Sequence, residues 1–201
     1  MTPPVPRAAI LGLGSYAPEG RVTNADLEKL VETSDAWIVE RCGIRERRKA
    51  APDQMASDLG LAACRAALAD AGCDPKDVEA IIVGTASGDM PFPSTACFIQ
   101  TGLGAAGGAA FDLTAACSGF LYALCVAHDT VAAGRYRRVL AIGTEVLTRV
   151  TDYQDRGTCI LFGDAAGAVL VGPPDVPGAH RILHSRMHAD GRLAKLLYMP
   201  G

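Results

Sequence analysis

The stretch FDLTAACSGFLYALCVAHDTVAAG, residues 111–134, places a thiol between a short apolar strand and a long apolar helix. The pattern predicts a strand near Ala109, and then Cys117 at the start of a helix over 117–133 that ends at Gly134. A helix start presents unpaired backbone N–H groups and a partial positive charge, and both favour a thiolate over a thiol. Cys117 is therefore a candidate nucleophile. From its position alone, a buried structural cysteine is an equally good interpretation.

Composition narrows the class of protein. The chain has 201 residues, of which 49% are hydrophobic and 20% charged, as in an ordinary globular protein. A net charge of -3 argues against nucleic acid as a partner. Seven cysteines without a C-x-x-C pair, and an opening stretch unlike a secretory signal, predict a reducing cytoplasm. No apolar run reaches the roughly 18 residues that a membrane span needs, so we expect no membrane association.

Short apolar runs alternate with helical patterns. One helix is expected over 54–71, ending at Gly72; the 117–133 helix is apolar on nearly every side, which predicts burial all round. Continuous apolarity in the strands predicts a sheet covered on both faces, and the alternation predicts an α/β fold with a largely parallel sheet. The runs are AAILGLG (8–14), AIIVGT (80–85), AAFDLT (109–114), RVLAIGT (138–144) and AGAVLVG (166–172), and a further strand is expected over 180–188.

The first 50 residues are less regular. Thr23 or Asn24 can cap a short helix through Leu30, and Ser34 can cap another that carries Trp37 and Arg41. The basic run over 41–49 is most often a solvated face, and the alternative is a phosphate contact for an anionic cofactor. Trp37 beside Arg41 strengthens that alternative, because an indole can stack on a nucleobase while a guanidinium holds phosphate.

Gly12, Gly14 and Ala17 fit the G-x-G-x-x-A dinucleotide fingerprint, which would indicate a nicotinamide enzyme. Pro18 and Gly20 stand where the phosphate-binding helix should run, so a turn at the end of a strand is the better interpretation.

The four histidines suggest neither a metal site nor a base. His180, His184 and His188 would be spread about 13 Å apart along a strand, too far to share an ion, so we expect no metal site. His128 lies about 16 Å along the helix axis from Cys117, out of reach of its thiol.

Four stretches read together resemble successive motifs of β-ketoacyl-acyl-carrier-protein synthase III, a condensing enzyme of the thiolase superfamily. They are SDAWIVERCGIRERR (34–48), PFPSTACFIQ (91–100), FDLTAACSGF (111–120) and DRGTCILFGDAAGAVL (155–170). The resemblance implies a thiolase-like α/β fold with a mixed sheet covered by helices. It also implies an acyltransferase that transfers the acyl group of an acyl-CoA to a cysteine and condenses that group with malonyl-acyl-carrier protein, starting type II fatty acid synthesis.

The resemblance also implies roles for individual residues. Cys117 matches the acyl-accepting nucleophile, and its backbone N–H matches part of an oxyanion hole. Phe92 matches a residue that reaches across a dimer interface into the neighbouring acyl pocket, with simple core packing as the alternative. A homodimer is therefore expected.

The nucleotide of CoA has its own expected contacts. Trp37 and Arg156 resemble the pair that sandwiches the adenine, and Thr33 and Arg41 resemble further nucleotide contacts nearby. In this interpretation acyl-CoA is a substrate, and no separate cofactor is implied.

The match covers the first three-fifths of such a synthase. Residues 1–172 are expected to form the N-terminal module, and 173–201 a linker and the start of an incomplete second module. Family members carry a catalytic histidine and asparagine in the second half, and no histidine of this chain lies in a matching motif. We therefore expect acylation of Cys117 without condensation. The alternatives are a starter-unit or ester-forming synthase of polyketide or other secondary metabolism and a non-catalytic module that binds CoA or a carrier protein.

Overall fold

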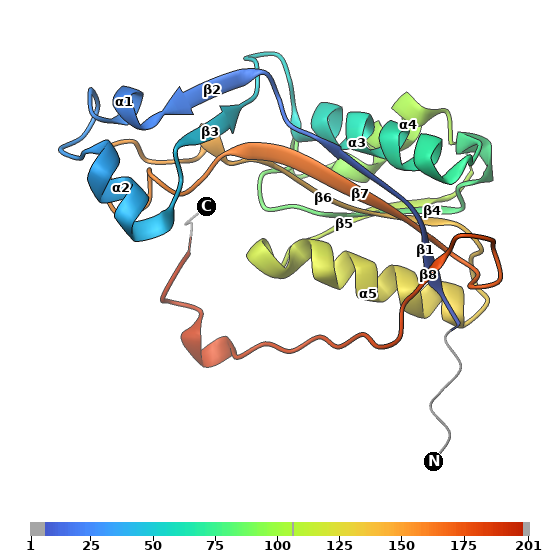
Figure 1. Ribbon diagram of the computed structural model, residues 1–201. Coiled ribbons are helices and arrows are strands. Elements are labelled where there is room, and N and C mark those ends of the chain that lie inside the picture. The colour runs from blue at the N-terminus through green and yellow to red at the C-terminus, as the bar shows by residue number, and fades with distance from the viewer. Residues whose placement is uncertain (1–6, 106, 199–201) are drawn as a thin grey trace.

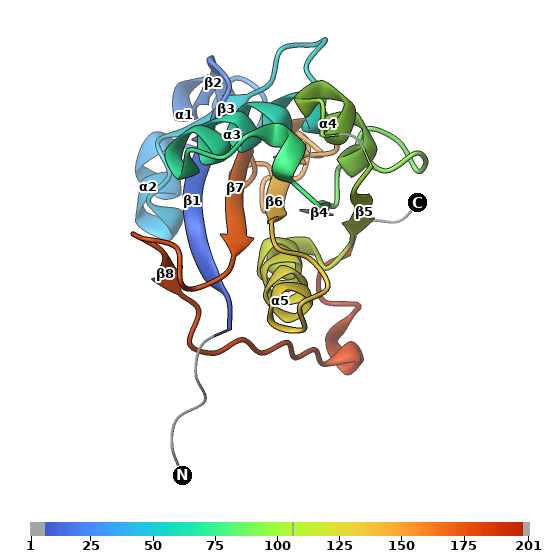
Figure 2. The ribbon, with the colours of Figure 1, turned by 90° about the vertical axis from the view of Figure 1, so that its right-hand side faces the viewer.

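The computed structural model describes residues 7–105 and 107–198. The main sheet contains β1 (Ala9–Tyr16), β4 (Ala80–Gly84), β5 (Ala109–Leu113), β6 (Val139–Val146), β7 (Asp164–Gly172) and β8 (His180–Arg181). The helices are α1 (Asn24–Leu27), α2 (Asp35–Cys42), α3 (Ala56–Ala71), α4 (Thr95–Leu103) and α5 (Gly119–Ala132). Short 3₁₀ turns lie at Pro75–Asp77, Ala116–Ser118, Leu147–Arg149 and Gly191–Leu193. Helices α3 and α4 cover one face of the sheet and α5 covers the other (Figure 1 and Figure 2), as the continuous apolar runs predict.

The sheet is mixed, with strand order β5-β4-β6-β7-β1-β8. Strand β4 runs parallel to β5 and β6, whereas β7 runs antiparallel to β6 and to β1. The expectation of a largely parallel sheet is wrong, and the mixed sheet implied by the family resemblance is confirmed. The physical reason lies in the connection from β6 to β7, which contains no crossover α-helix and returns the chain antiparallel to the strand it left.

Helix α3 crosses β1 at close range. A Cβ on Gly12 would lie 2.5 Å from the carbonyl oxygen of Ala67, and one on Gly14 would lie 2.2 Å from that of Ala63. No side chain fits at these distances, so both glycines of the apparent dinucleotide fingerprint serve strand–helix packing. The helix ends at Gly72 in the left-handed conformation, as predicted.

Helix α5 packs one face on β4 and β6, where Ala123 is fully buried. Its outer face carries Leu121, which is 58% exposed, so the expectation of burial on all sides is wrong for the described residues. The extended segment after β8 runs along this face, and Tyr122 donates a hydrogen bond to the carbonyl of His188 at 2.8 Å. The strand expected over 180–188 is confined to β8. The domain boundary after residue 172 stays a prediction.

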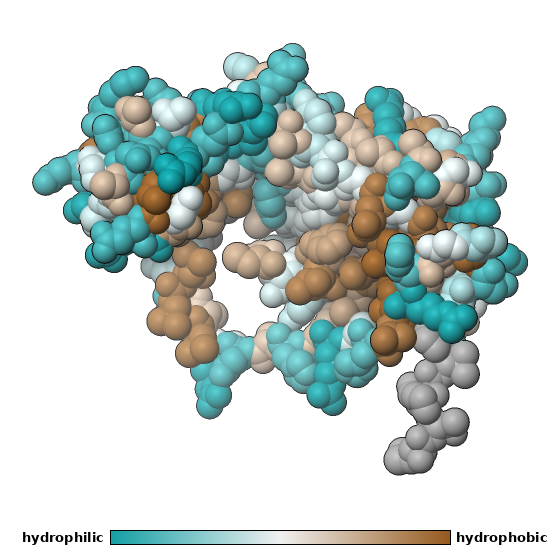
Figure 3. All heavy atoms as spheres, viewed as in Figure 1, coloured by the Kyte–Doolittle hydropathy of each residue, from teal (hydrophilic) through white to brown (hydrophobic). Residues whose placement is uncertain are grey.

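Hydrophobic surface gathers along this region. Figure 3 shows it over the middle of the molecule and toward the two ends of the extended segment, whereas the middle of that segment and the lobe around α1 and α2 are largely hydrophilic. Three exposed leucines contribute, namely Leu121, Leu183 and Leu196.

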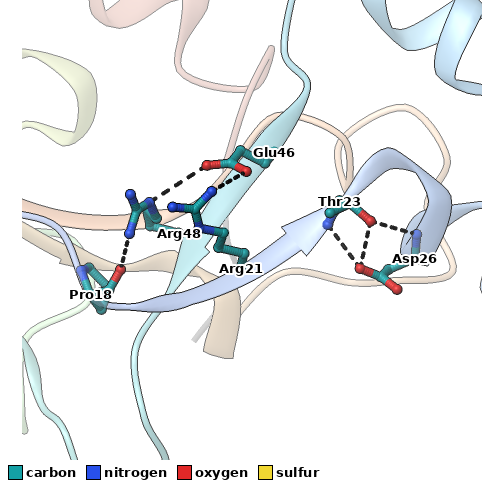
Figure 4. A network of polar contacts seen from close by, with 6 residues as sticks. All are labelled: Pro18, Arg21, Thr23, Asp26, Glu46 and Arg48. Atoms are coloured by element: carbon teal, nitrogen blue, oxygen red, sulfur yellow. Dashed lines mark hydrogen bonds and ion pairs between the residues drawn. The ribbon is translucent and has the colours of Figure 1, made fainter.

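A smaller lobe beside the sheet contains α1, α2 and a two-stranded ribbon of β2 (Gly20–Thr23) and β3 (Glu46–Lys49). Arg21 and Arg48 face each other across the ribbon. Their guanidinium nitrogens lie 3.0 and 3.8 Å from the carboxylate of Glu46 (Figure 4). One carboxylate thus offsets two positive charges on a surface that water reaches.

Both predicted helix caps of this lobe are present. The Thr23 hydroxyl accepts a hydrogen bond from the backbone N–H of Asp26, and the Asp26 carboxylate accepts one from the backbone N–H of Thr23 (Figure 4). The Ser34 hydroxyl caps α2 in the same way by accepting from the N–H of Trp37. Helix α1 ends at Leu27, earlier than the expected Leu30.

Within the described part of the chain, no helix combines the length and the apolar character needed to cross a membrane. Among the same residues, no three His, Cys, Asp or Glu side chains are placed to share a metal ion. All seven cysteines are free thiols.

Candidate active site

Cys117 lies in the turn between β5 and α5, at the carboxyl ends of the parallel strands, and its side chain is exposed. Exposure rules out the buried structural cysteine. Residues 116–118 form a 3₁₀ turn, so α5 begins at Gly119, two residues after the predicted start. Ala116 has φ of 42°, a left-handed conformation that costs a non-glycine residue about 1 kcal/mol or more. The chain thus bends sharply immediately before the thiol.

Two close contacts seat the first turn of α5 on the sheet. Gly119 lies against the backbone of Gly84 at the end of β4, and the side chain of Phe120 lies over Gly143 of β6. A Cβ on Gly143 would be 2.9 Å from that of Phe120, so a larger residue there would push the helix outward. These glycines fix the height of the Cys117 turn above the strand ends.

A cavity of about 870 Å³ opens beside the thiol. It is large enough for a small-molecule ligand and its walls are mainly apolar, which suits a hydrocarbon chain. The ends of β4, β6 and β7 and the segment after β6 contribute to it. The lining includes Cys117, Phe120, Leu147, Val150, Phe162 and Tyr198.

Trp37 holds two guanidinium groups against its ring. The guanidinium carbon of Arg156 lies 4.2 Å from the indole centroid, and that of Arg41 lies 4.8 Å from it. Arg41 is one turn from Trp37 on α2, whereas Arg156 comes from the segment between β6 and β7. A nucleobase stacked between the indole and the Arg156 guanidinium would require these two groups to lie about 7 Å apart, which is twice a contact distance. Arg156 therefore has to move outward before a nucleobase can bind there.

Thr33 directly precedes Ser34, the N-cap of α2, and is four residues before Trp37 in the chain. Its hydroxyl oxygen is buried and has no hydrogen-bond partner among the described residues. An unsatisfied buried hydroxyl costs about 1–3 kcal/mol, so a polar ligand atom at this place would be stabilised. The roles of Thr33, Trp37, Arg41 and Arg156 at a nucleotide stay predictions.

The basic run over 41–49 is not a uniformly solvated face. Arg47 is only 4% exposed, and its Nε donates to the carbonyl of Ile160 at 2.9 Å. It also donates to Asn24, and burial lowers the pKa of its guanidinium. Arg47 therefore ties β3 to the segment that carries Arg156, while Arg41 is the member of the run beside Trp37.

Phe92 projects from the segment between β4 and α4. Its side chain is 82% exposed, so the interpretation as core packing is wrong. Its expected place at a dimer interface stays a prediction.

The other thiols differ from Cys117. Burial raises the pKa of Cys64, Cys73 and Cys159, which lowers the fraction of each that is thiolate at neutral pH. Cys117 is the exposed thiol in the described part of the chain.

Glu145 is a residue that the sequence analysis missed. It stands near the end of the apolar strand β6 and lines the Cys117 cavity. Its carboxylate accepts hydrogen bonds from the N–H of Ala86 at 2.8 Å and from the hydroxyl of Ser87. A charged residue inside the apolar run RVLAIGTEV was a signal that could have marked it.

Comparison with known proteins supports this picture. Residues 111–191 match the sequence model of 3-oxoacyl-[acyl-carrier-protein (ACP)] synthase III. The β-ketoacyl-[acyl-carrier-protein] synthase III of Caldanaerobacter subterraneus subsp. tengcongensis is 53% identical over 96% of this chain, and the alignment covers 58% of that protein. The chain thus spans about three-fifths of the length of the curated relatives it matches.

Solved structures show the same relationship. The 3-oxoacyl-(acyl carrier protein) synthase III of Pseudomonas aeruginosa PAO1 superposes with a TM-score of 0.90 at 39% identity, over 97% of this chain and 61% of that one. The priming β-ketosynthase of the R1128 polyketide pathway gives 0.82 at 42% identity, over 89% of this chain and 53% of that one. The fold is therefore thiolase-like, and the chain is similar to about three-fifths of a β-ketoacyl-[acyl-carrier-protein] synthase III.

Proposed function

We propose that this chain is the cysteine-bearing part of an acyltransferase that condenses an acyl-CoA starter with malonyl-acyl-carrier protein at the start of type II fatty acid synthesis. The observation that carries the proposal is the exposed thiol of Cys117 in a bent turn at the mouth of an apolar cavity of about 870 Å³. Binding of the nucleotide part of CoA is supported by a second group of residues. The indole of Trp37 offers a stacking surface, Arg41 and Arg156 offer positive charge, and Thr33 offers a hydroxyl without a partner among the described residues.

The first half-reaction is a transfer between two thiols. The thiolate of Cys117 attacks the thioester carbonyl carbon, the bond from that carbon to the CoA sulfur breaks, and CoA leaves as its thiolate, which takes up a proton. Negative charge develops on the carbonyl oxygen, and the backbone N–H of Cys117 is the proposed donor that stabilises it. The acyl chain then occupies the apolar cavity.

The second half-reaction makes a different demand. Loss of CO₂ from a malonyl thioester leaves an enolate, and donors must lie on its oxygen. Among the described residues that line the cavity there is neither a histidine nor an asparagine. We therefore expect the 201-residue chain alone to accept an acyl group on Cys117 without forming a β-ketoacyl product.

Intact-protein mass spectrometry after incubation with acetyl-CoA tests the acylation. The expected result is a gain of one acetyl group, located on Cys117 by peptide mapping. Cys117→Ala should abolish the adduct, while Cys97→Ala, which removes a half-exposed thiol on α4, should retain it. Binding of CoA without any adduct would support the non-catalytic module instead. Detection of a condensation product from the purified chain would refute the second expectation.

A starter-unit synthase of polyketide metabolism is the second candidate. It is favoured by the likeness to the R1128 priming β-ketosynthase, whose 42% identity is similar to the 39% of the 3-oxoacyl-(acyl carrier protein) synthase III of Pseudomonas aeruginosa. Acylation rates with a series of acyl-CoA esters separate the two. A preference for acetyl-CoA supports fatty acid initiation, and a preference for longer or substituted acyl groups supports polyketide priming.

An oligomeric state and a cellular location are also proposed for this chain. The exposed Phe92 and the hydrophobic surface along α5 support a homodimer or a partner chain that covers apolar area. Seven free thiols support a reducing compartment, for which the cytoplasm is the proposed location.

A further inference from the structure

Glu145 places a carboxylate in the mainly apolar wall of the cavity beside Cys117. It belongs to β6, is half-buried, and lines the cavity. A half-buried carboxylate has to be satisfied by hydrogen bonds, since desolvation of a charge is costly. The partners that satisfy Glu145 show what the residue does.

All of these partners belong to one short turn. Glu145 accepts from the backbone N–H of Ala86 at 2.8 Å, from the Ser87 hydroxyl, and at 3.4 Å from the Thr85 hydroxyl. Ser87 completes the ring, because its hydroxyl accepts from the backbone N–H of Val146 at 2.8 Å. The carboxylate thus locks residues 85–87 onto the end of β6.

The same turn holds the segment that leads to Cys117. The backbone N–H of Thr85 donates to the carbonyl of Leu113 at 3.2 Å, and the hydroxyl of Thr114 donates to the carbonyl of Thr85 at 3.5 Å. Leu113 is the last residue of β5, and the 3₁₀ turn with the nucleophile begins at Ala116. A continuous series of hydrogen bonds therefore runs from Glu145 to the start of the Cys117 turn.

We propose that Glu145 is a positioning residue that holds the 85–87 turn against the end of β5 and thereby fixes the Cys117 thiol for acyl transfer. The proposal rests on the proposed function for its kinetic consequence, and on the hydrogen bonds alone for its structural consequence. Acyl transfer depends on a defined angle of attack, and a displacement of about 1 Å can slow such a reaction by about a hundredfold.

Three variants separate positioning from other roles. Glu145→Ala removes every acceptor. Glu145→Gln keeps a carbonyl oxygen for the N–H of Ala86 and offers an N–H to the Ser87 hydroxyl, so it should restore the contacts without the charge. Glu79→Ala is the matched control, because Glu79 also accepts a backbone hydrogen bond, from Arg137 at 2.7 Å, but stands before the opposite end of β4 and away from the cavity.

The kinetic test is single-turnover acylation of Cys117 by acetyl-CoA. Glu145→Ala should lower the maximal rate about tenfold to a hundredfold and leave the half-saturating acetyl-CoA concentration unchanged, because the nucleotide contacts lie elsewhere. Glu145→Gln and Glu79→Ala should stay close to the wild type. If Glu145→Gln is as slow as Glu145→Ala, the charge matters and the positioning role is overturned; an unimpaired Glu145→Ala overturns it equally.

Hydrogen exchange keeps the two proposals distinguishable. Glu145→Ala should speed exchange at the Ala86 amide and in the peptide spanning 113–118, and Glu79→Ala should not. If the wild-type chain is not acylated at all, the proposed function is wrong. The hydrogen-exchange pattern then tests on its own whether Glu145 holds the 85–87 turn in position. Unchanged exchange in Glu145→Ala would overturn the inference whatever the kinetics show.

Discussion

Gly84 and Gly119 meet backbone to backbone where β4 ends and α5 begins. A Cβ on Gly84 would lie 2.3 Å from the carbonyl carbon of Gly119, whereas a Cβ on Gly119 would lie 3.4 Å from the nearest backbone carbons of Gly84. The contact is therefore tight from one side and ordinary from the other. It sets the position of the helix start two residues after Cys117.

This asymmetry predicts opposite effects for two similar substitutions. Gly84→Ala should lower the free energy of unfolding by about 1–3 kcal/mol, because the added methyl group must displace α5. Gly119→Ala should be neutral or stabilising by about 0.4–1 kcal/mol, since its helical backbone accepts alanine and the added Cβ makes only an ordinary contact, at 3.4 Å. Urea denaturation of both variants measures the difference. Equal losses from the two would contradict the packing described here.

The stacked group around Trp37 predicts a weakened nucleotide site when Arg156 is removed. Arg156→Ala should raise the dissociation constant for CoA about fivefold to tenfold, the equivalent of about 1 kcal/mol of cation–π energy. Trp37 is the single tryptophan of the chain, so its fluorescence reports binding directly. Arg21→Ala is the control, because Arg21 is an exposed arginine paired with Glu46. Equal weakening by Arg21→Ala would indicate general charge attraction and not stacking.

The seven thiols should react in a defined order with iodoacetamide at neutral pH. Cys117 should be alkylated first because it is exposed, and Cys64 last because burial both shields it and raises its pKa. Peptide mapping during the reaction gives the order, and in denaturant all seven should react alike. Early modification of Cys64 in the folded protein would contradict its position in the core.

Phe92 predicts the behaviour of the proposed homodimer. Phe92→Glu should shift the protein toward monomer in sedimentation velocity, because it places a charge on an apolar side chain that is 82% exposed in the single chain. Leu30→Glu, at an exposed leucine after α1, should leave the distribution unchanged. A wild-type chain that is monomeric at all accessible concentrations would rule out the interface.

The cap of α1 predicts a pH effect on stability. The hydrogen bond from the Thr23 side chain, followed by that from Lys29, lowers the pKa of Asp26 below its unfolded value. Because the pKa of Asp26 is lower in the folded than in the unfolded protein, its ionised carboxylate stabilises the folded state at a pH above the unfolded value, which is about 4. This stabilisation is lost as the pH falls through the pKa of the folded state. Wild type should therefore exceed Asp26→Asn in thermal midpoint at neutral pH, and the gap should close in strong acid. A gap that widens on acidification would show that the sign is wrong.

Local pattern alone determined a large part of this protein. Continuous apolar runs predicted the five long strands, and Gly72, Thr23 and Ser34 predicted helix ends, because propensity and capping act over a few residues. The direction of each strand could not be predicted from local sequence, because the antiparallel orientation of β7 depends on which strands pair across the sheet. The sequence also marked Cys117, and it placed Arg41 one helical turn from Trp37.

Tertiary structure decided the rest of the site. Arg156 is 119 positions from Trp37 in the chain, and only folding stacks its guanidinium on the indole. Gly12 and Gly14 fit a dinucleotide fingerprint in the sequence, and their packing role became visible only where α3 crosses β1. The charge inside an apolar run could have marked Glu145 in the sequence, but its role became recognisable only when β6 lay beside β4, because its hydrogen bonds join residues about 60 positions apart. A nucleophile can be marked by its neighbours in sequence, but the groups that orient it are brought together by contacts distant in the chain.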